Sequence, residues 1–149
     1  MFSVIVKKGR ARPLWCGHPW LMSGAVQRVD GAPENGDVVR VVDAEGRAIG
    51  IGLFNGQSQI RVRMLDLAQG NAAAAPPVAA LIQAGIARAP ELRRALGFPS
   101  ARTTGFRLVN AEGDGLPGVT IDRFANAVVA QVTTLGMWRE RAALREAFP

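Results

Sequence analysis

The chain has 149 residues, of which 48% are hydrophobic and 20% charged, and its formal net charge is +6. This composition supports one ordinary folded domain or two small ones and excludes a disordered tail. No run approaches the roughly 20 apolar residues of a membrane helix, and Lys7 and Lys8 interrupt the N-terminal stretch too early for a signal peptide. A cytoplasmic protein with no membrane partner is expected, and a single cysteine, Cys16, excludes an internal disulfide.

The positive charge points to nucleic acid as a partner. Sixteen of the eighteen basic residues are arginine, whose planar guanidinium pairs with phosphate and stacks on bases. A genome rich in G and C would also enrich arginine and alanine, whatever the function of the protein. Charge alone does not separate these two explanations.

The first elements are a short strand at 3–6 and a run of cations, followed by a short helical turn between two prolines. Cations beside flat rings suit the phosphates and unpaired bases of RNA. The alternative is that Trp15 and Trp20 are core residues and that the cations form a solvated rim. The residues of this stretch assigned to RNA binding are Lys7, Lys8, Arg10, Arg12, His18 and Trp20.

The next segment is β in character. Apolar residues alternate in three runs with turn residues between them. Gly50 and Gly52 occupy one face of the second run, which indicates a close approach by another backbone or by a ligand. The three expected strands are 38–42, 47–54 and 58–65.

Two arginines of the third expected strand are also assigned to RNA. Arg61 and Arg63 point to the same face, roughly 6 to 7 Å apart along the strand, close to the spacing of successive phosphates. Polar residues alternate on most half-buried strands, so this pattern gains weight only beside the cations of the N-terminal stretch.

A composition break at 66–77, with small residues and a double proline, is interpreted as a domain boundary. Apolar residues then recur at helical spacing, and Pro90 predicts either two helices or one kinked helix. Gly97 fits the end of that helix. The arginines expected on its solvated face are Arg88, Arg93 and Arg94.

Alternating runs around a glycine-dense loop predict a hairpin over 106–124, then a strand at 127–132 and a helix at 135–148. The loop is not a calcium site, because Ile121 occupies the position that needs a bidentate glutamate. Asp122 is expected to pair locally or to face a neighbouring domain. The acids expected to face solvent, too few for a catalytic pair, are Glu112, Asp114 and Asp122.

A strand-strand-strand-helix unit leaves a sheet edge and a helix face without partners. We therefore expect burial in this unit to be incomplete. The chain has no phosphate-cradling or Rossmann-type glycine motif, and Cys16 with His18 cannot make a zinc site or a catalytic triad. No catalytic, cofactor-binding or metal-binding residue is assigned, and Cys16 is expected to be a buried packing residue.

Three stretches, in order along the chain, carry a family resemblance. They are KKGRARPLWCGHPWLMSGAV at 7–26, SQIRVRMLD at 58–66 and RLVNAEGDGLPGVTIDRF at 107–124. Together they resemble the bacterial 23S ribosomal RNA cytosine-5 methyltransferases that carry an N-terminal PUA domain. The resemblance implies an α+β fold without the family's Rossmann-like S-adenosylmethionine domain. In the family the middle domain continues with further strands, so we expect the chain to be a fragment or a naturally shortened relative. Its expected parts are a PUA-type β pseudobarrel at 1–68, a linker and helical connection at 69–99, and an incomplete α/β middle domain at 100–149.

The resemblance also implies a function. The chain would be the RNA-binding portion of an S-adenosylmethionine-dependent ribosomal RNA (cytosine-5) methyltransferase, positioning structured RNA for a catalytic domain. The cofactor would bind to a full-length relative and not to this chain, so whether the chain alone is an enzyme stays undecided. Two alternatives remain open: a free-standing PUA-type RNA-binding module without enzymatic activity, and a protein-interaction module using the Gly50 and Gly52 strand or the unfinished sheet. A homodimer is also open.

Overall fold

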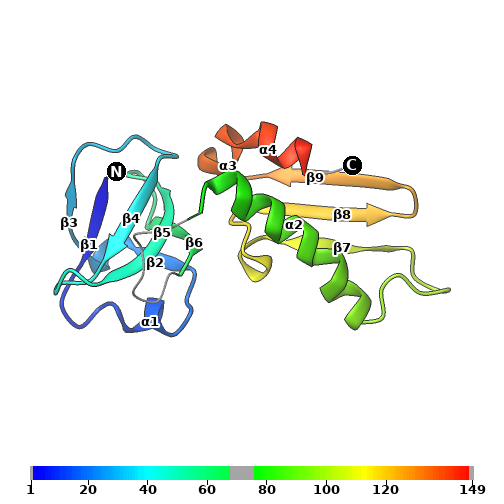
Figure 1. Ribbon diagram of the computed structural model, residues 1–149, viewed down its shortest axis with the longest axis horizontal. Helices are drawn as coiled ribbons and strands as arrows, with labels where there is room; N and C mark the ends of the chain where they lie inside the picture. Colours follow the sequence, from blue (N-terminus) through cyan, green and yellow to red (C-terminus); the bar gives the residue numbers. More distant parts are fainter. Residues whose placement is uncertain (1, 68–75, 148–149) are drawn as a thin grey trace. The chain divides into compact units, whose positions relative to one another are not determined.

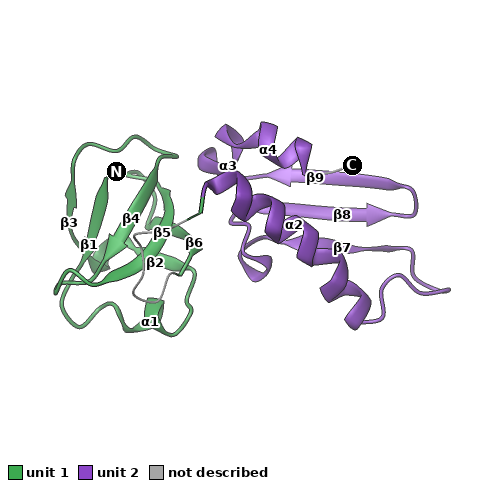
Figure 2. Cartoon of the chain, in the orientation of Figure 1, with its two compact units in different colours: residues 1–76 green, residues 77–149 purple. Residues whose placement is uncertain are grey.

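The computed structural model describes residues 2–67 and 76–147, and the chain divides into two compact units, Met1–Pro76 and Pro77–Pro149 (Figure 2). Both units contain strands and helices, which confirms the predicted α+β class. Most of the composition break at 66–77 and the last predicted helical residue, Phe148, lie outside the described residues.

Unit 1 is built on a curled six-stranded sheet in the order β2-β6-β5-β4-β1-β3 (Figure 1). β1 and β4 are parallel, and every other neighbouring pair is antiparallel. A single helical turn, α1 (Arg12–Trp15), and a 3-10 turn at Ser23–Ala25 interrupt the strands. The strands are β1 (Ser3–Val6), β2 (Trp20–Met22), β3 (Val26–Asp30), β4 (Val38–Val42), β5 (Ala48–Phe54) and β6 (Ile60–Asp66).

The four predicted strands of this region are confirmed, but β2 and β3 were not predicted. β2 has only three residues, and β3 buries none of its side chains fully, so neither carries a strong alternation of apolar and polar residues. Both are edge strands of the sheet, where pairing is decided by the neighbouring strand.

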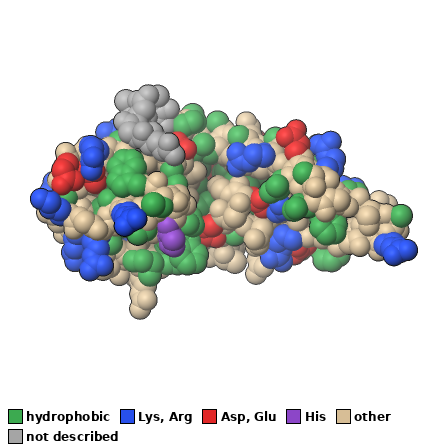
Figure 3. All heavy atoms as spheres, turned by 90° about the horizontal axis from the view of Figure 1, so that it is seen from below, with side chains coloured by type: hydrophobic (Ala, Val, Ile, Leu, Met, Phe, Trp, Pro, Cys, Tyr) green, Lys and Arg blue, Asp and Glu red, His purple; other side chains and the backbone are tan. Residues whose placement is uncertain are grey.

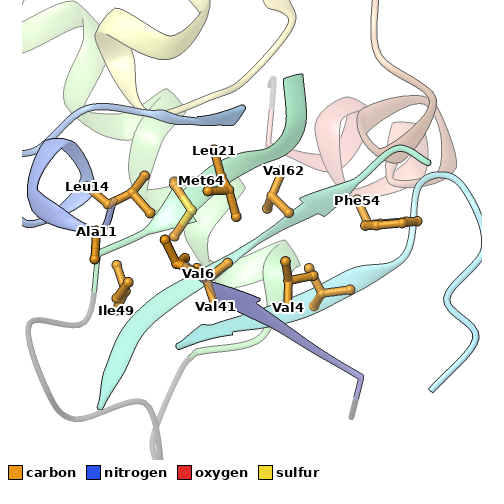
Figure 4. Close-up of a cluster of buried hydrophobic side chains, with 11 residues drawn as sticks. Val4, Val6, Ala11, Leu14, Leu21, Val41, Ile49, Phe54, Val62 and Met64 are labelled. Atoms are coloured by element: carbon orange, nitrogen blue, oxygen red, sulfur yellow. The ribbon is translucent and has the colours of Figure 1, made fainter. Parts of the chain in front are cut away.

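The core of unit 1 draws on both the strands and the turn between the two prolines (Figure 4). Leu14 of α1 is 2% exposed and packs with the inward side chains of the strands. Trp15 is half-buried at its margin, while Trp20 is 37% exposed, so the alternative that both tryptophans are core residues is wrong for Trp20. The core residues are Val4, Val6, Ala11, Leu14, Leu21, Val39, Val41, Ile49, Phe54, Val62 and Met64.

The two glycines of β5 are explained by the neighbouring strand. A Cβ at Gly52 would lie 2.5 Å from the carbonyl oxygen of Arg63, and one at Gly50 would collide with the carbonyl oxygen of Asp66. The predicted close approach is therefore by another backbone, that of β6. Side-chain-free positions allow β5 and β6 to bend together where their register shifts between Ile51 and Gly52.

Unit 2 combines an antiparallel sheet in the order β7-β8-β9 with three helices (Figure 1). The predicted hairpin and third strand are confirmed. α2 packs against β7 and α4, and Gly85 allows the close approach of Leu116, whose Cγ would lie 3.0 Å from an added Cβ. The elements are α2 (Val78–Ala95), β7 (Gly105–Asn110), β8 (Val119–Phe124), β9 (Ala127–Val132), α3 (Leu135–Arg139) and α4 (Arg141–Glu146).

Pro90 lies inside α2, so the alternative of two separate helices is wrong. The ring is on the exposed side, and the buried Ile86, Ala89 and Arg93 anchor the helix on either side of it. At the C-terminal end the prediction of a single helix is wrong, because the segment is divided at Glu140 into α3 and α4.

Gly97 ends α2 as predicted. Its φ of 84° is in the left-handed region, and its N–H donates to the Arg94 carbonyl at 2.9 Å. The N–H of Phe98 donates to the Arg93 carbonyl, also at 2.9 Å. These two bonds form a Schellman motif, which satisfies carbonyls that the helix end would otherwise leave unpaired.

Two charged residues of unit 2 were predicted to be solvated and are buried. Asp114 is 7% exposed and Arg93 is 8% exposed, and the two form an ion pair. The Asp114 carboxylate also accepts the N–H of Asn110, and Arg93 Nε donates to the Arg107 carbonyl at 2.7 Å. The 3-10 turn at Ala111–Asp114 brings this carboxylate inward against α2, an effect that helical periodicity cannot reveal.

The remaining acids near the hairpin behave differently. Asp122 of β8 pairs with Arg107 of β7, Nε to Oδ1 at 2.8 Å, which confirms its local pairing. The hydrogen bond from Arg107 lowers the pKa of Asp122 below its ordinary value, and the same bond raises the pKa of Arg107. Glu112 is half-buried rather than solvent-facing.

Candidate nucleic-acid interface

The cations of the N-terminal stretch lie on the loop between β1 and α1. Arg10 N–H donates to the Lys7 carbonyl at 2.9 Å, and this turn places Gly9 at a φ of 76°, where a side chain would be strained. Lys7 Nζ donates to the carbonyl of Gly24 at 2.9 Å, which ties the loop to the 3-10 turn before β3. All four cations of the loop and the start of α1 are exposed: Lys7, Lys8, Arg10 and Arg12.

Three of these cations line a hollow of about 210 Å³ between the loop, α1 and the β4–β5 turn. We call it the arm hollow. Its wall includes the half-buried ring of Trp15 and two acids, Asp43 and Glu45. Arg10 is not among the lining residues. The four cations of the arm hollow are Lys7, Lys8, Arg12 and Arg47.

Arg47 is the functional candidate that sequence reasoning missed. Its guanidinium carbon lies 5.9 Å from the centroid of the Trp15 ring, within the range of a cation–π contact. Its Nε donates to Asp43 Oδ2 at 2.6 Å, and its Nη2 lies 3.7 Å from Glu45 Oε2. A turn of the form Asp-x-x-x-Arg was the only available signal, and it does not reveal that Trp15 lies beside it.

Asp43 organises this turn from a buried position, with 2% of its side chain exposed. Its Oδ1 accepts the N–H groups of Glu45 at 3.1 Å and of Arg47 at 2.8 Å. Burial raises the pKa of Asp43, but the hydrogen bonds and charge of Arg47 outweigh it, so the pKa lies below its ordinary value of 3.8. The carboxylate is thus ionised and holds Arg47 at the arm hollow.

A second group forms around Trp20, at the edge of the sheet. Arg63 is directly opposite Trp20 in the β2–β6 pairing, and its guanidinium carbon lies 5.6 Å from the Trp20 ring centroid. The His18 ring meets the Trp20 ring edge-on, with centroids 5.8 Å apart and an interplanar angle of 79°. We call Trp20, His18 and Arg63, together with the exposed Met22, the Trp20 platform.

Arg61 does not join Arg63, although both were predicted to contact RNA from one face of the strand. Arg61 Nη1 donates to the carbonyls of Asn55 and Gly56, in the turn between β5 and β6. Its guanidinium therefore stabilises that turn. The structure brings together Lys7, Lys8 and Arg12 at the arm hollow and His18, Trp20 and Arg63 at the platform, and places Arg10 and Arg61 outside both.

In Figure 3 the single histidine, His18, is purple, and Lys and Arg side chains are blue on both units. Cys16, expected to be buried, is exposed, because its position just after α1 turns it away from the core that Leu14 enters.

Among residues 2–67 and 76–147 no group of three His, Cys, Asp or Glu side chains could hold a metal ion. No helix in the described part of the chain is both long and apolar enough to span a membrane.

The fold and this surface can be compared with known proteins. A family model described as a PUA-like domain matches residues 4–67. Unit 1 contains a PUA-like domain. The arm hollow and the Trp20 platform both lie within the matched residues.

Relatives of known name match nearly the whole chain. It is 40% identical over 148 residues to the ribosomal RNA large subunit methyltransferase I of Shewanella amazonensis, covering 97% of this chain and 36% of that protein. It is 36% identical over 143 residues to the protein of the same name from Serratia proteamaculans, covering 95% of this chain and 34% of that protein. The chain thus spans about a third of the length of these relatives.

Solved structures agree on the fold. A SAM-dependent methyltransferase from Streptococcus mutans superposes with a TM-score of 0.82 at 20% identity, covering 99% of this chain and 37% of that one. A methyltransferase complexed with SAH gives a TM-score of 0.78 at 19% identity, with the same two coverages. At these identities the likeness establishes the fold alone.

Proposed function

We propose that this chain is an RNA-binding portion of an S-adenosylmethionine-dependent ribosomal RNA (cytosine-5) methyltransferase, and that unit 1 holds structured ribosomal RNA for base methylation. The observation that carries the proposal is the gathering of cations and exposed rings on a PUA-like domain. The names of the relatives support the reaction and the RNA class. Target base and cofactor belong to the proposal, with S-adenosylmethionine assigned to the part of the relatives beyond the matched third.

The arm hollow suits the RNA backbone. Lys7, Lys8, Arg12 and Arg47 line the same hollow, so a phosphate entering it would be close to several cations. Asp43 and Glu45 offset two of the four positive charges, so the arm hollow keeps an excess of two positive charges. Backbone contacts of this kind position RNA without reading its sequence.

The free-standing RNA-binding module would use the same surface, and only the presence of a catalytic partner distinguishes it. The protein-interaction alternative rests on a different observation, in unit 2. Val128 and Val129 of β9 are 49% and 56% exposed, and a hollow of about 420 Å³ with an apolar lining runs between β8, β9 and α4. An exposed apolar edge strand is a usual site of pairing with another chain.

Salt-dependent RNA binding tests the proposal. A triple variant of cations that line the arm hollow, Lys7→Gln, Lys8→Gln and Arg12→Gln, should bind a ribosomal RNA hairpin more weakly. The slope of log affinity against log salt should become shallower by roughly 0.7 to 0.9 for each phosphate that the variant no longer binds.

The matched control removes the same charge from exposed positions of unit 2. It combines Arg94→Gln, Arg102→Gln and Arg145→Gln, and it should leave the salt slope close to that of the unchanged protein. Equal losses of affinity in the two triple variants would mean unspecific attraction to a basic protein. Absence of salt-dependent binding by the unchanged chain would favour the protein-interaction alternative.

A further inference from the structure

We infer that the Trp20 platform binds one unpaired nucleotide, with the base stacked on the Trp20 ring and the adjoining phosphate bound by Arg63. This inference deepens the proposed function and rests on RNA binding by unit 1. It assigns to the platform a role distinct from that of the arm hollow. Stacking on the platform selects an unstacked base, whereas the arm hollow would contact only the RNA backbone.

The ring is presented to solvent by the geometry of β2. Side chains alternate along the strand, so the inward Leu21, 1% exposed, forces Trp20 and Met22 outward. Trp20 is 37% exposed and Met22 is 43% exposed. Two large apolar side chains exposed on one sheet edge leave apolar surface in contact with water. A base stacked on them would bury part of that surface, which is favourable.

The strand that carries the ring is fixed at both ends. The Pro19 carbonyl accepts the N–H of Met64 at 2.8 Å, and Ser23 N–H donates to the Gln59 carbonyl at 2.7 Å. His18 Nδ1 lies 3.2 Å from both the backbone N and the backbone O of Trp20, and this contact further fixes the backbone of Trp20. A ring that is already ordered loses little conformational entropy when a ligand stacks on it.

Arg63 supplies the charge that a nucleotide requires. Direct pairing of Trp20 with Arg63 in the sheet holds the guanidinium against the ring, 5.6 Å from its centroid. A guanidinium in this position can donate to a phosphate while it remains over the ring. An aromatic ring and a cation are thus already adjacent before RNA binds, the pairing that stacking sites for single strands combine.

The platform also restricts the form of RNA. In an A-form helix the bases are stacked inside and the shallow groove displays hydroxyls and base edges, so a sheet-edge tryptophan cannot reach a base face. Loops, bulges and ends expose unstacked bases that can be stacked on aromatic side chains. The expected ligand is therefore a nucleotide in a loop or single strand.

Trp138 provides a matched control within the same chain. It is 55% exposed, and the guanidinium carbon of Arg141 lies 5.3 Å from its ring centroid. It therefore repeats the Trp–Arg pair of the platform, without a histidine ring against it, and it belongs to α3 of unit 2, outside the residues that match the PUA-like model. Trp15 is unsuitable as a control, because it is half-buried and lines the arm hollow.

The test measures the affinity of the full chain for a short oligoadenylate and for an abasic oligomer with the same ribose-phosphate backbone. Trp20→Ala should weaken binding of oligoadenylate by roughly five- to 150-fold, the range for removal of one base–aromatic stack. The affinity of Trp20→Phe for oligoadenylate should lie between those of the unchanged protein and Trp20→Ala, since the smaller phenyl ring still stacks on a base. The abasic oligomer should bind all these variants equally, and Trp138→Ala should behave like the unchanged protein.

A spectroscopic readout locates the stack. With Trp15→Phe and Trp138→Phe in place, Trp20 is the single tryptophan of the chain. Oligoadenylate should quench its fluorescence and the abasic oligomer should not. If Trp20→Ala unfolds unit 1, Trp20→Leu keeps an apolar side chain without a π-face and carries the same expectation.

The outcomes separate the two proposals. If the chain binds oligoadenylate and Trp20→Ala or Trp20→Leu binds it equally well, the platform is not a stacking site, whereas RNA binding by unit 1 stands. That result would instead fit a protein partner at the platform. If the unchanged chain binds the ribosomal RNA hairpin but not oligoadenylate, the platform fails and the proposed function stands. If it binds neither oligomer nor the hairpin in a salt-dependent manner, both fail.

Discussion

Arg93 of α2 and Asp114 of the hairpin loop form an ion pair that is almost fully withdrawn from water, with 10% and 6% of the two side chains exposed. The pair connects the helix to the turn that leads into β8, and it shares the Asp114 carboxylate with the N–H of Asn110. Buried charges are tolerated only when each is paired and hydrogen-bonded. Unit 2 therefore depends on both partners being present.

Asp114→Ala should lower the free energy of unfolding of unit 2 by about 3–5 kcal/mol, because it leaves the Arg93 guanidinium buried without its counter-charge. Amide hydrogen exchange of β7 and β8 under increasing urea measures this. The control is Asp122→Ala, which removes the surface partner of Arg107, a side chain that is 50% exposed. It should produce a much smaller change. Equal destabilisation by the two variants would contradict a special role for the buried pair.

Gly52→Ala should destabilise unit 1, because the added Cβ would lie 2.5 Å from the Arg63 carbonyl oxygen and force β5 and β6 apart. The expected cost is about 1–3 kcal/mol in the free energy of unfolding, typical of overpacking, measured by urea denaturation. Gly24→Ala is the control, since nothing lies within 4 Å of a Cβ there. A Gly52→Ala protein as stable as the control would mean that the two strands can separate without cost.

These glycines illustrate what could be predicted from the sequence. Two glycines on one face of an apolar strand indicate that another group approaches that face closely. This holds in any fold, because the missing side chains are visible in the sequence itself. Alternation of period two likewise located β4, β5 and β6, and the glycine-dense loop located the hairpin. In each case the deciding interaction lies between residues near in sequence or follows from backbone geometry.

The errors arose where distant residues decide the outcome. Arg93 has the sequence environment of a solvated helix face, and only the inward turn of the loop 21 positions later makes it a buried partner. Arg61 and Arg63 are alike in sequence, yet one bonds to a turn and the other lies against Trp20. Arg47 reaches the candidate site through Asp43 and Trp15, which periodicity does not connect.

The difference between the two neighbouring arginines of β6 leads to a prediction. Arg63→Gln should make the salt dependence of RNA binding shallower by roughly 0.7, the value for one phosphate contact on a single strand. Arg61→Gln should leave that slope unchanged and instead weaken the β5–β6 turn, because it removes the donor to the Asn55 and Gly56 carbonyls. Titrations at several salt concentrations, with thermal unfolding alongside, separate the effects. A slope change in Arg61→Gln equal to that in Arg63→Gln would contradict this division.

The last prediction concerns the acid that holds Arg47. Asp43→Asn should lower the free energy of unfolding of unit 1 at neutral pH by about 1–3 kcal/mol, because the buried side chain loses a charge-assisted bond from Arg47 Nε. Asp30→Asn, which affects an exposed pair with Arg28, should cost much less at the same pH. Urea denaturation measures both variants.

The pH dependence of the same residue follows from its lowered pKa. The folded protein binds a proton at Asp43 less readily than the unfolded chain, whose pKa is near the ordinary 3.8. The stabilisation from Asp43 is therefore fully present above that value and is lost as the pH falls through the lower folded pKa. Unfolding free energies measured from neutral pH to about pH 2 should fall more steeply in the unchanged protein than in Asp43→Asn. Parallel curves would mean that Asp43 is not the carboxylate whose ionisation holds the β4–β5 turn, and that Arg47 is positioned at the arm hollow by packing against Trp15 alone.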